Sequence, residues 1–361
     1  MPSWENNVRK VTPYTPGEQP KIRNIIKLNT NENPYPPSPL VKQAIEGIGD
    51  DLLRRYPDPA SSMLVDAIAG RYGVEPEQVF VGVGSDDVLA MSFLTFFASG
   101  REILFPEITY SFYDVWADLF RIPYETKKLD AEFRIVNRDY YGENGGIVFP
   151  NPNAPTGVLK RLDEIEEIIA RNRDVVVIID EAYIDFSDGH DGGIPPQSAL
   201  HLVDRYDNLL VVQTFSKSRS LAGMRIGYAI GSAKLIRYLN DAKYSFNSYT
   251  MNQTSIAAGV AAIEDQAYYA ECLQKVRDTR KRTQSALAAL GFCFHPSQAN
   301  FLFVTHPDVK AKDLFSALRQ AGIIVRYFDK PGIDNYLRIT IGTDEEMDAL
   351  LAFLGDYLKK H

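Results

Sequence analysis

The sequence predicts an α/β protein in which a large domain, with a mostly parallel sheet between helices, is joined to a smaller α/β domain. Short apolar segments alternate with amphipathic helical segments from Val79 onward, which is the pattern of a parallel sheet. The segment 175–179 is continuously apolar, as expected of a strand covered on both faces. The length of 361 residues suggests about two domains, and the charged helical segment 267–290 is suited to connect them.

Composition and charge exclude several classes of protein. The hydrophobic content of 45% and the charged content of 24% are typical of globular enzymes. The net charge of −8 argues against nucleic acid or an anionic membrane as the main partner. The apolar run 175–179 is too short to span a bilayer, and the opening segment MPSWENN gives no reason to expect a signal peptide. Cys272 and Cys293 lack metal-ligand spacing with the histidines, so we expect a cytoplasmic protein without a metal site.

The N-terminal region is expected to be largely irregular. Residues 1–26 contain four prolines and few periodic apolar residues, which predicts an extended arm. A polar loop follows at 28–34, and the prolines after it open a helix that extends to about Ile48. A short amphipathic helix is expected from Ser61 to Tyr72. We assign residues 1–35 to the arm and to part of the smaller domain.

Residues 36–265 are predicted to form the large domain. Its strands are apolar runs bounded by turn residues, and its helices are amphipathic. One helix has a further signal, because Asp163 and Glu166 have the spacing of a capping box. The expected strands cover 79–81, 102–105, 122–127, 146–149, 175–179, 209–213 and 226–230. The expected helices cover 87–98, 109–119, 163–170, 233–243 and 252–263.

Residues 266–361 are predicted to form the smaller domain after the connecting helix. The last helix begins at Thr343, which has Glu346 at the third helical position as in a capping box, and its leucines recur on one face. The other expected elements are strands near Phe301, at 323–326 and at 337–341, and helices at 311–321 and 344–358.

One lysine, Lys217, lies in the turn between two apolar strands. An amine on such a turn is held rigidly and partly desolvated, which makes it a better nucleophile toward a carbonyl. The hydroxyls beside it and Arg225 offer donors suited to a phosphate. Amine and phosphate donors together suggest pyridoxal phosphate held as a Schiff base. The alternative, which Lys217 alone would favour, is a solvated surface lysine.

Two other strand ends carry candidate binding groups. The segment 82–86 lies where a strand passes into a helix, and free backbone N–H groups there bind phosphate, although a glycine turn capped by Asp86 is an equal interpretation. Asp180 ends the strand 175–179, where its carboxylate could pair with a protonated pyridine nitrogen. Alternatively, Asp180 caps a turn, or it binds a divalent metal together with Glu181, although the phosphate loop expected beside such a site is missing.

Other candidates are weaker on their own. The ring of Tyr110 could stack on a cofactor, but packing is the default role in a chain with 20 tyrosines. Arg326 and Arg338 lie in late strands, either as solvated edge residues or as forks that clamp the anionic groups of a substrate. The loop 29–33 could be turn chemistry only.

Eight segments in the right order and spacing resemble the fold-type I PLP-dependent aminotransferases, and within them the histidinol-phosphate aminotransferases. The segments are LNTNENPYP (28–36), RYPD (55–58), VGVGSDD (81–87), PNAPTG (152–157), VVVIIDEAYIDF (175–186), TFSKSRSLAGMRIGY (214–228), IIVRYF (323–328) and YLRITIGTDEE (336–346). The resemblance covers the chain from Tyr14 to the last helix, and it implies a seven-stranded sheet in the large domain.

The resemblance implies roles for the matching residues. Lys217 would bind the cofactor and carry the proton between the substrate Cα and cofactor C4′, Asp180 would pair with the pyridine nitrogen, and Tyr183 would hydrogen-bond the phenolic oxygen. Tyr110 would stack on the ring. The other implied cofactor ligands, which hold the phosphate, are Gly84, Ser85 and Asp86 (the last two through backbone amides), Thr214, Ser216, Arg225, and Tyr56 from the neighbouring subunit of an obligate homodimer. The implied substrate residues are Arg338 for a carboxylate, Arg326 and Tyr14 for a phosphate, and Asn31.

The chain departs from the family pattern at two places. Ala154 stands where the family has an asparagine for the phenolic oxygen, so either Asn153 replaces it or Tyr183 acts alone. The segment 245–249, SFNSY, differs from the usual Pro-Tyr-Asn-Val-Asn, which leaves its substrate contacts open.

The expected function is PLP-dependent transamination of L-histidinol phosphate with 2-oxoglutarate, giving imidazole-acetol phosphate and L-glutamate in histidine biosynthesis. An aromatic amino acid aminotransferase and a PLP-dependent decarboxylase of an amino-acid phosphate are the alternatives within PLP chemistry. A non-catalytic binding module is disfavoured, because it would not explain a lysine among phosphate donors.

Overall fold

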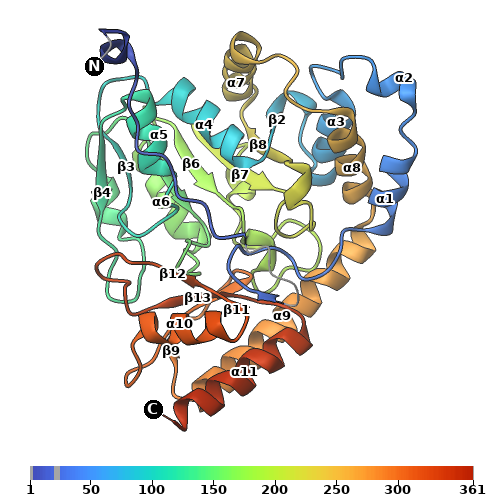
Figure 1. The fold of residues 1–361 in the computed structure, drawn as a ribbon. Coiled ribbons are helices and arrows are strands. Elements are labelled where there is room, and N and C mark those ends of the chain that lie inside the picture. Colours follow the sequence, from blue (N-terminus) through green and yellow to red (C-terminus); the bar gives the residue numbers. More distant parts are fainter. Residues whose placement is uncertain (1–2, 20–24, 361) are drawn as a thin grey trace.

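The computed structural model describes residues 3–19 and 25–360, and it has two parts joined by the long helix α9 (Gln266–Ala289). The larger part contains a seven-stranded sheet with helices on both faces, and the smaller part contains short sheets beside α9 and two further helices (Figure 1). The fold class and the single connecting helix agree with the sequence-based prediction. The predicted domain limits of 35/36 and 265/266 stay a prediction that this arrangement supports.

The large sheet has the order β2-β8-β7-β6-β5-β3-β4. All of its parallel pairs lie between β7 and β4, whereas β8 is antiparallel to both of its neighbours. The predicted seven-stranded, mostly parallel sheet is therefore confirmed. The strands are β2 (Val79–Gly82), β3 (Ile103–Pro106), β4 (Tyr124–Lys127), β5 (Ile147–Pro150), β6 (Val177–Asp180), β7 (Leu209–Thr214) and β8 (Gly227–Gly231).

Alternate residues of these strands enter two separate cores. In β6, Ile178 packs against one group of helices, and Val177 and Ile179 pack against the other. Every residue of β6 is therefore buried, which explains its continuous apolar sequence. One face is covered by α4 (Ser85–Phe96), α5 (Tyr113–Phe120) and α7 (Ala233–Phe246). The other is covered by α1 (Pro39–Glu46), α3 (Ser62–Tyr72), α6 (Leu162–Arg171) and α8 (Gln253–Glu264), and the short α2 (Asp50–Leu53) follows α1.

The smaller part is built from both ends of the chain. The strand β1 (Ile26–Lys27) pairs in parallel with β11 (Ile323–Ile324), so this N-terminal strand belongs to a sheet of the smaller part. A second sheet has the order β12-β13-β10-β9 and is antiparallel. Its strands are β9 (Cys293–Phe294), β10 (Phe301–Thr305), β12 (Arg326–Tyr327) and β13 (Leu337–Thr340), and the helices are α10 (Ala311–Gln320) and α11 (Asp344–Leu358).

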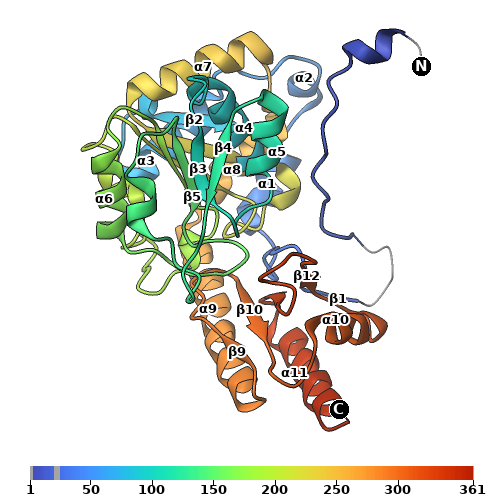
Figure 2. The ribbon, with the colours of Figure 1, turned by 90° about the vertical axis from the view of Figure 1, so that its left-hand side faces the viewer.

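The N-terminal arm begins with a 3-10 helix at Ser3–Asn7 and then passes beside α5 toward the smaller part (Figure 2). The guanidinium of Arg9 donates to the carbonyl oxygen of Leu119 at 2.6 Å. The ring of Tyr14 stacks on Phe112 with 4.1 Å between centroids. Residues 20–24 of the predicted arm lie outside the described part of the chain.

Three predictions about local structure are wrong. Arg161, not Asp163, is the N-cap of α6, and Glu164 accepts its backbone N–H at 3.2 Å, while Glu166 accepts the hydroxyl of Tyr206 instead. The helix expected from Thr109 begins only at Tyr113, because the intervening residues form a loop at the end of β3. The strand expected at 323–326 divides into β11 and β12, which belong to different sheets.

None of the helices in the described ranges combines the length and the apolar character that crossing a membrane requires.

Candidate active site

A cavity of about 170 Å³ lies where the carboxyl ends of β5, β6 and β7 meet the beginning of α4. Parallel strands of an α/β sheet bring their ends together in this way, which is why such crevices hold ligands. The sequence-predicted residues that line it are Ser85, Asp86, Tyr110, Asp180, Tyr183, Thr214, Ser216, Lys217 and Arg225. The structure therefore brings together residues from four separate stretches of the chain, at 85–86, 110, 180–183 and 214–225.

Lys217 points into this cavity and not into bulk water. Its Nζ donates to the backbone carbonyl of Thr30 at 3.1 Å and lies 5.7 Å from the centre of the Tyr183 ring. The turn that carries it is closed by backbone hydrogen bonds from Phe215 to Ile226 and from Leu221 to Phe215. A half-buried amine on a rigid turn can attack an aldehyde in a defined direction, which rejects the alternative of a solvated surface lysine.

Asp180 presents a buried carboxylate to the same cavity. It accepts hydrogen bonds from the hydroxyl of Tyr113 at 3.0 Å and from the backbone N–H of Ala182 at 3.2 Å. Burial is the main cause that raises the pKa of Asp180 to about 6, while these hydrogen bonds act in the opposite direction. A buried carboxylate in this position can accept a hydrogen bond from a protonated pyridine nitrogen and is stabilised by its positive charge.

The geometry does not support a metal site at Asp180 and Glu181. Glu181 points to the other side of the sheet, where it accepts hydrogen bonds from Ser198, Ala199 and Gln213 at 2.6–2.8 Å. Burial raises the pKa of Glu181 to about 7. The two carboxylates are neighbours in sequence, but strand alternation separates them in space.

The beginning of α4 and the lysine turn together form a cup suited to a phosphate. Gly84 has a φ of 84°, and a Cβ at this position would lie 2.5 Å from Nη2 of Arg225. A Cβ at Gly227 would lie 2.3 Å from the backbone nitrogen of Ser85, so only glycine permits this close approach. Helical backbone N–H groups, the hydroxyls of Thr214 and Ser216 and a guanidinium thus face one space, as phosphate recognition requires.

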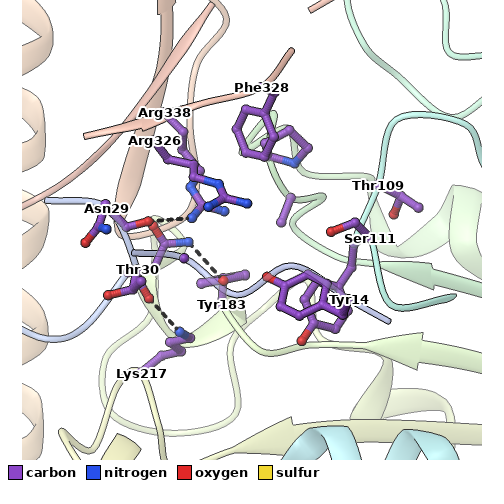
Figure 3. A pocket seen from close by; sticks show the side chains of 15 residues that line it. Tyr14, Asn29, Thr30, Thr109, Ser111, Tyr183, Lys217, Arg326, Phe328 and Arg338 are labelled. Carbon is purple, nitrogen blue, oxygen red and sulfur yellow. Dashed lines mark hydrogen bonds between the residues drawn. The ribbon is translucent and has the colours of Figure 1, made fainter. Parts of the chain in front are cut away.

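A second cavity of about 140 Å³ opens on the other side of Lys217 and Tyr183. Arg326 and Arg338 enter it from directly opposite positions on β12 and β13 (Figure 3). Nη2 of Arg338 donates to the carbonyl of Asn29 at 2.9 Å, whereas its buried Nε has no hydrogen-bond partner among the described residues. Burial and the neighbouring Arg326 lower the pKa of Arg338 from its ordinary value. The predicted Tyr14 and Asn31 also line this cavity.

The loop 29–33 has more functions than the sequence indicated. The side chain of Asn31 donates to the hydroxyl of Tyr183 at 3.0 Å, and the side chain of Asn33 donates to the carbonyl of Lys217 at 3.1 Å. Asn31 has a φ of 57°, which asparagine tolerates better than most residues. In the sequence, the signal was three closely spaced asparagines followed by a proline. This signal did not show which residues the loop would hydrogen-bond.

Three predicted cofactor ligands, Gly84, Asn153 and Tyr56, are not among the residues that line either of these two cavities. Asn153 is buried, and its amide donates to the carbonyl of Ile108 at 2.9 Å and to Thr156 at 3.2 Å, while Ala154 lines the cavity instead. Tyr56 is 79% exposed, and its ring packs at a tilt against Tyr249 with 4.7 Å between ring centroids. The segment 245–249 therefore contacts Tyr56 in this chain and does not line either cavity.

Comparison with known proteins gives a consistent result. Histidinol-phosphate aminotransferase 1 of Hydrogenovibrio crunogenus is 53% identical over 356 residues, which cover 99% of this chain and 98% of the relative. Histidinol-phosphate aminotransferase 2 of Dechloromonas aromatica is 54% identical over 351 residues, which cover 96% of each chain.

Solved structures with the same fold are more distant in sequence. The histidinol-phosphate aminotransferase from Clostridium acetobutylicum has a TM-score of 0.85 at 22% identity, covering 93% of this chain and 100% of the other. The enzyme of that name from Sinorhizobium meliloti, in complex with pyridoxal-5'-phosphate, has a TM-score of 0.82 at 24% identity, covering 94% and 92%. A family model described as Aminotransferase class I and II matches residues 23–354. The chain therefore belongs to the class I and II aminotransferase family.

Proposed function

We propose that this enzyme transfers the amino group of L-histidinol phosphate to 2-oxoglutarate, giving imidazole-acetol phosphate and L-glutamate in histidine biosynthesis. The observation that carries the proposal is the pair Arg326 and Arg338, which face one cavity beside Lys217. The relatives named histidinol-phosphate aminotransferase at about half identity support the same assignment.

The cofactor in this proposal is pyridoxal phosphate, and the donor set fits it. When bound, it supplies an aldehyde that links to amines and a ring that withdraws electrons from the substrate Cα. Lys217 would hold the aldehyde carbon, Tyr110 would lie against the ring, and the cup at Ser85 and Arg225 would hold the phosphate. Asp180 would hold the ring nitrogen in its protonated form, because burial destabilises the carboxylate and an adjacent positive charge offsets that cost.

The proton transfers are assigned to Lys217. When its amine is free, it is held by the carbonyl of Thr30 and lies between the two cavities, within reach of a substrate Cα in either half of the reaction. Tyr183 lines both cavities and accepts a hydrogen bond from Asn31, so its hydroxyl proton is free to be donated to the phenolic oxygen. Tyr183 would therefore act without the asparagine that Ala154 replaces.

The two arginines would divide the substrates between them. No acidic side chain lines the second cavity in the described part of the chain, so the positive charge of both guanidiniums is available to a substrate. The unpartnered Nε of Arg338 favours a planar carboxylate, which an arginine binds with two parallel hydrogen bonds. Arg326 and the hydroxyl of Tyr14 are placed to bind a phosphate. A donor such as phenylalanine has a carboxylate but no phosphate, so it would leave Arg326 without its partner.

An amino-donor screen on the cofactor-loaded protein tests the proposal. Purified protein with 2-oxoglutarate would be offered histidinol phosphate, histidinol as the matched donor without phosphate, phenylalanine and tyrosine, and glutamate formation would be followed. We expect histidinol phosphate to exceed the other donors by roughly a hundredfold in kcat/KM, because none of them offers a phosphate to Arg326 and Tyr14. Equal rates with phenylalanine would reject the substrate, and release of carbon dioxide in place of glutamate formation would reject transamination.

We also infer that the enzyme is a homodimer in which Tyr56 enters the neighbouring cavity. Tyr56 is highly exposed in the single chain, and so are the nearby Leu53 (62%) and Met63 (67%) and the more distant Phe246 (74%). Large apolar side chains that are this exposed in a single chain are consistent with burial in a subunit interface. If Tyr56 acts on the partner, mixing inactive Lys217→Ala and Tyr56→Ala variants under subunit exchange should restore activity. The absence of any recovery in confirmed mixed dimers would contradict this arrangement.

The proposed setting is the cytoplasm. Cys272 and Cys293 are both free thiols, as expected of a protein in a reducing compartment. Detection of the enzyme in a fractionated cell lysate tests this proposal.

A further inference from the structure

The side chain of Asp86 forms a bridge inside the cofactor cavity that its predicted role does not explain. The hydroxyl of Tyr110 donates to Oδ1 of Asp86 at 2.7 Å, and Nη2 of Arg225 donates to Oδ2 at 3.2 Å. One carboxylate thus joins the residue expected below the cofactor ring to the residue expected at its phosphate. The family resemblance assigns only the backbone amide of Asp86 to cofactor binding.

The bridge does not occupy the guanidinium of Arg225. This group has five N–H donors, of which Nη2 has one bond to Asp86 and Nη1 has one bond to the carbonyl of Ala222 at 3.3 Å. Its backbone has a φ of 51°, and its guanidinium packs directly on Gly84. Asp86 and Ala222 therefore fix the plane of the guanidinium and leave donors for a phosphate.

The bridge also holds the ring of Tyr110. Burial and the adjacent carboxylate raise the pKa of Tyr110 well above its ordinary value, so its hydroxyl stays a donor. The ring lies edge-on to Tyr113 with 5.8 Å between centroids, and the hydroxyl of Tyr113 donates to Asp180. Without Asp86, the Tyr110 hydroxyl would lose its charged acceptor, and the ring would lose the bond that fixes its tilt.

The ion pair alone contributes little to stability, because both side chains are about two-fifths exposed. A carboxylate in a phosphate cup also carries an electrostatic cost, because its charge repels the ligand. The Asp86 carboxylate is therefore better explained by the positions that it imposes on its neighbours than by a contribution to stability.

We propose that the Asp86 carboxylate is a positioning residue that sets the ring of Tyr110 and the guanidinium of Arg225 at the separation that pyridoxal phosphate requires. This inference rests on the proposed function. The opposing hypothesis is that Asp86 is only a negative charge that weakens phosphate binding.

The test compares Asp86→Ala and Asp86→Asn with the matched control Asp87→Asn. Asp87 also lies in the first turn of α4, but its carboxylate accepts the backbone N–H of Val83 at 2.8 Å. The probe is pyridoxamine 5'-phosphate, which has the same ring and phosphate but cannot form the covalent link. Its dissociation constant with the apoprotein would be measured by fluorescence quenching. Visible circular dichroism of bound pyridoxal phosphate would report the orientation of the ring.

We expect Asp86→Ala to weaken pyridoxamine phosphate on the order of tenfold and to reduce the circular dichroism per bound cofactor. Asp86→Asn, which keeps an acceptor for Tyr110, should lie between this variant and the wild type, and Asp87→Asn should stay near the wild type. In the Asp86→Ala background, Tyr110→Phe should add little, because both changes remove the same bond.

Tighter binding in both asparagine variants would overturn the inference in favour of a simple charge effect. Unchanged affinity and circular dichroism in Asp86→Ala would overturn it as well, and so would multiplicative losses in the double variant. Failure of the wild-type protein to bind either cofactor form would instead reject the proposed function, so the two failures are distinguishable. If Asp86→Ala does not fold, Asp86→Asn, alone and combined with Tyr110→Phe, decides the question.

Discussion

Replacement of Arg326 by glutamine is expected to separate the two halves of the reaction. Arg326 and Arg338 are direct neighbours across β12 and β13, but only Arg338 is tied to the carbonyl of Asn29 (Figure 3). Histidinol phosphate carries a phosphate and no carboxylate, whereas glutamate carries carboxylates only. The loss of Arg326 should therefore weaken the first substrate selectively.

The size of the effect follows from the surroundings of Arg326. A hydrogen bond to a charged group contributes about 1.5–3 kcal/mol, and each 1.4 kcal/mol corresponds to about tenfold. Among the described residues no carboxylate lines the cavity, so the guanidinium has no competing acidic partner there, and its full contribution is available to the phosphate. We expect kcat/KM for histidinol phosphate to fall roughly 10- to 150-fold. The value for glutamate should change less than about threefold, as for a substitution away from its contacts.

The assay follows each half-reaction separately through the absorbance of the bound cofactor, with histidinol phosphate or glutamate as the only donor. Arg338→Gln should give the reciprocal result, with the larger loss for glutamate. Arg319→Gln is the matched control. It removes an arginine that pairs with Glu18, and neither residue of this pair lines either cavity. Equal losses for the two donors in Arg326→Gln would refute the division of roles between the arginines.

Three further predictions follow from the same geometry. Lys217→Ala should abolish turnover and the visible absorbance of the lysine-linked cofactor, and an unchanged spectrum would reject the lysine assignment. Gly84→Ala should weaken the binding of pyridoxal phosphate roughly tenfold, because the added Cβ would lie 2.5 Å from Nη2 of Arg225. Gly223→Ala is the control and should bind normally, because a Cβ at this position meets no atom within 4 Å. Equal affinities of the two variants would contradict the close packing at Gly84. Burial raises the pKa of Glu181 to about 7, so the folded state holds this proton more tightly than the unfolded state does. Wild-type stability should therefore lose roughly 3 kcal/mol as the pH rises from about 4.5 to 7, a component that Glu181→Gln lacks, and parallel urea-unfolding profiles of the two proteins would refute it.

Local interactions made most of the secondary structure predictable. The cap at Thr343 with Glu346 is observed as expected, because a capping box involves only residues three positions apart. The buried strand β6 was equally clear, since both of its faces had to be apolar. The prediction failed at Asp163, because the helix begins one residue earlier, at Leu162, and the side chain of Asp163 pairs with Arg161 instead of capping the helix.

Candidate site residues were predictable where the type of residue and its place in the sequence indicate a role. They were not predictable where the role depends on the direction in which the side chain points. A lysine between hydroxyls identified Lys217, and a carboxylate at a strand end identified Asp180. Nothing local showed that the side chain of Asp86 would turn back to Tyr110 and Arg225, because these partners lie 24 and 139 positions away. Similarly, the sequence showed that Ala154 replaces an asparagine. It did not show that the amide of the adjacent Asn153 would donate to the carbonyl of Ile108, which lies in another loop.

Three consecutive residues of the loop 29–33 connect substrate recognition to the chemistry. The carbonyl of Asn29 holds Arg338, the carbonyl of Thr30 holds Lys217, and the side chain of Asn31 holds Tyr183. Two of these contacts use backbone oxygens, so their positions depend on the path of the loop and not on its side chains. That path is fixed at one end by the pairing of β1 with β11 in the smaller part, and near its middle by the bonds of Asn31 to Thr340. The smaller part therefore positions the amine of Lys217 as well as the guanidinium of Arg338, which explains why candidate site residues from both parts meet at this loop.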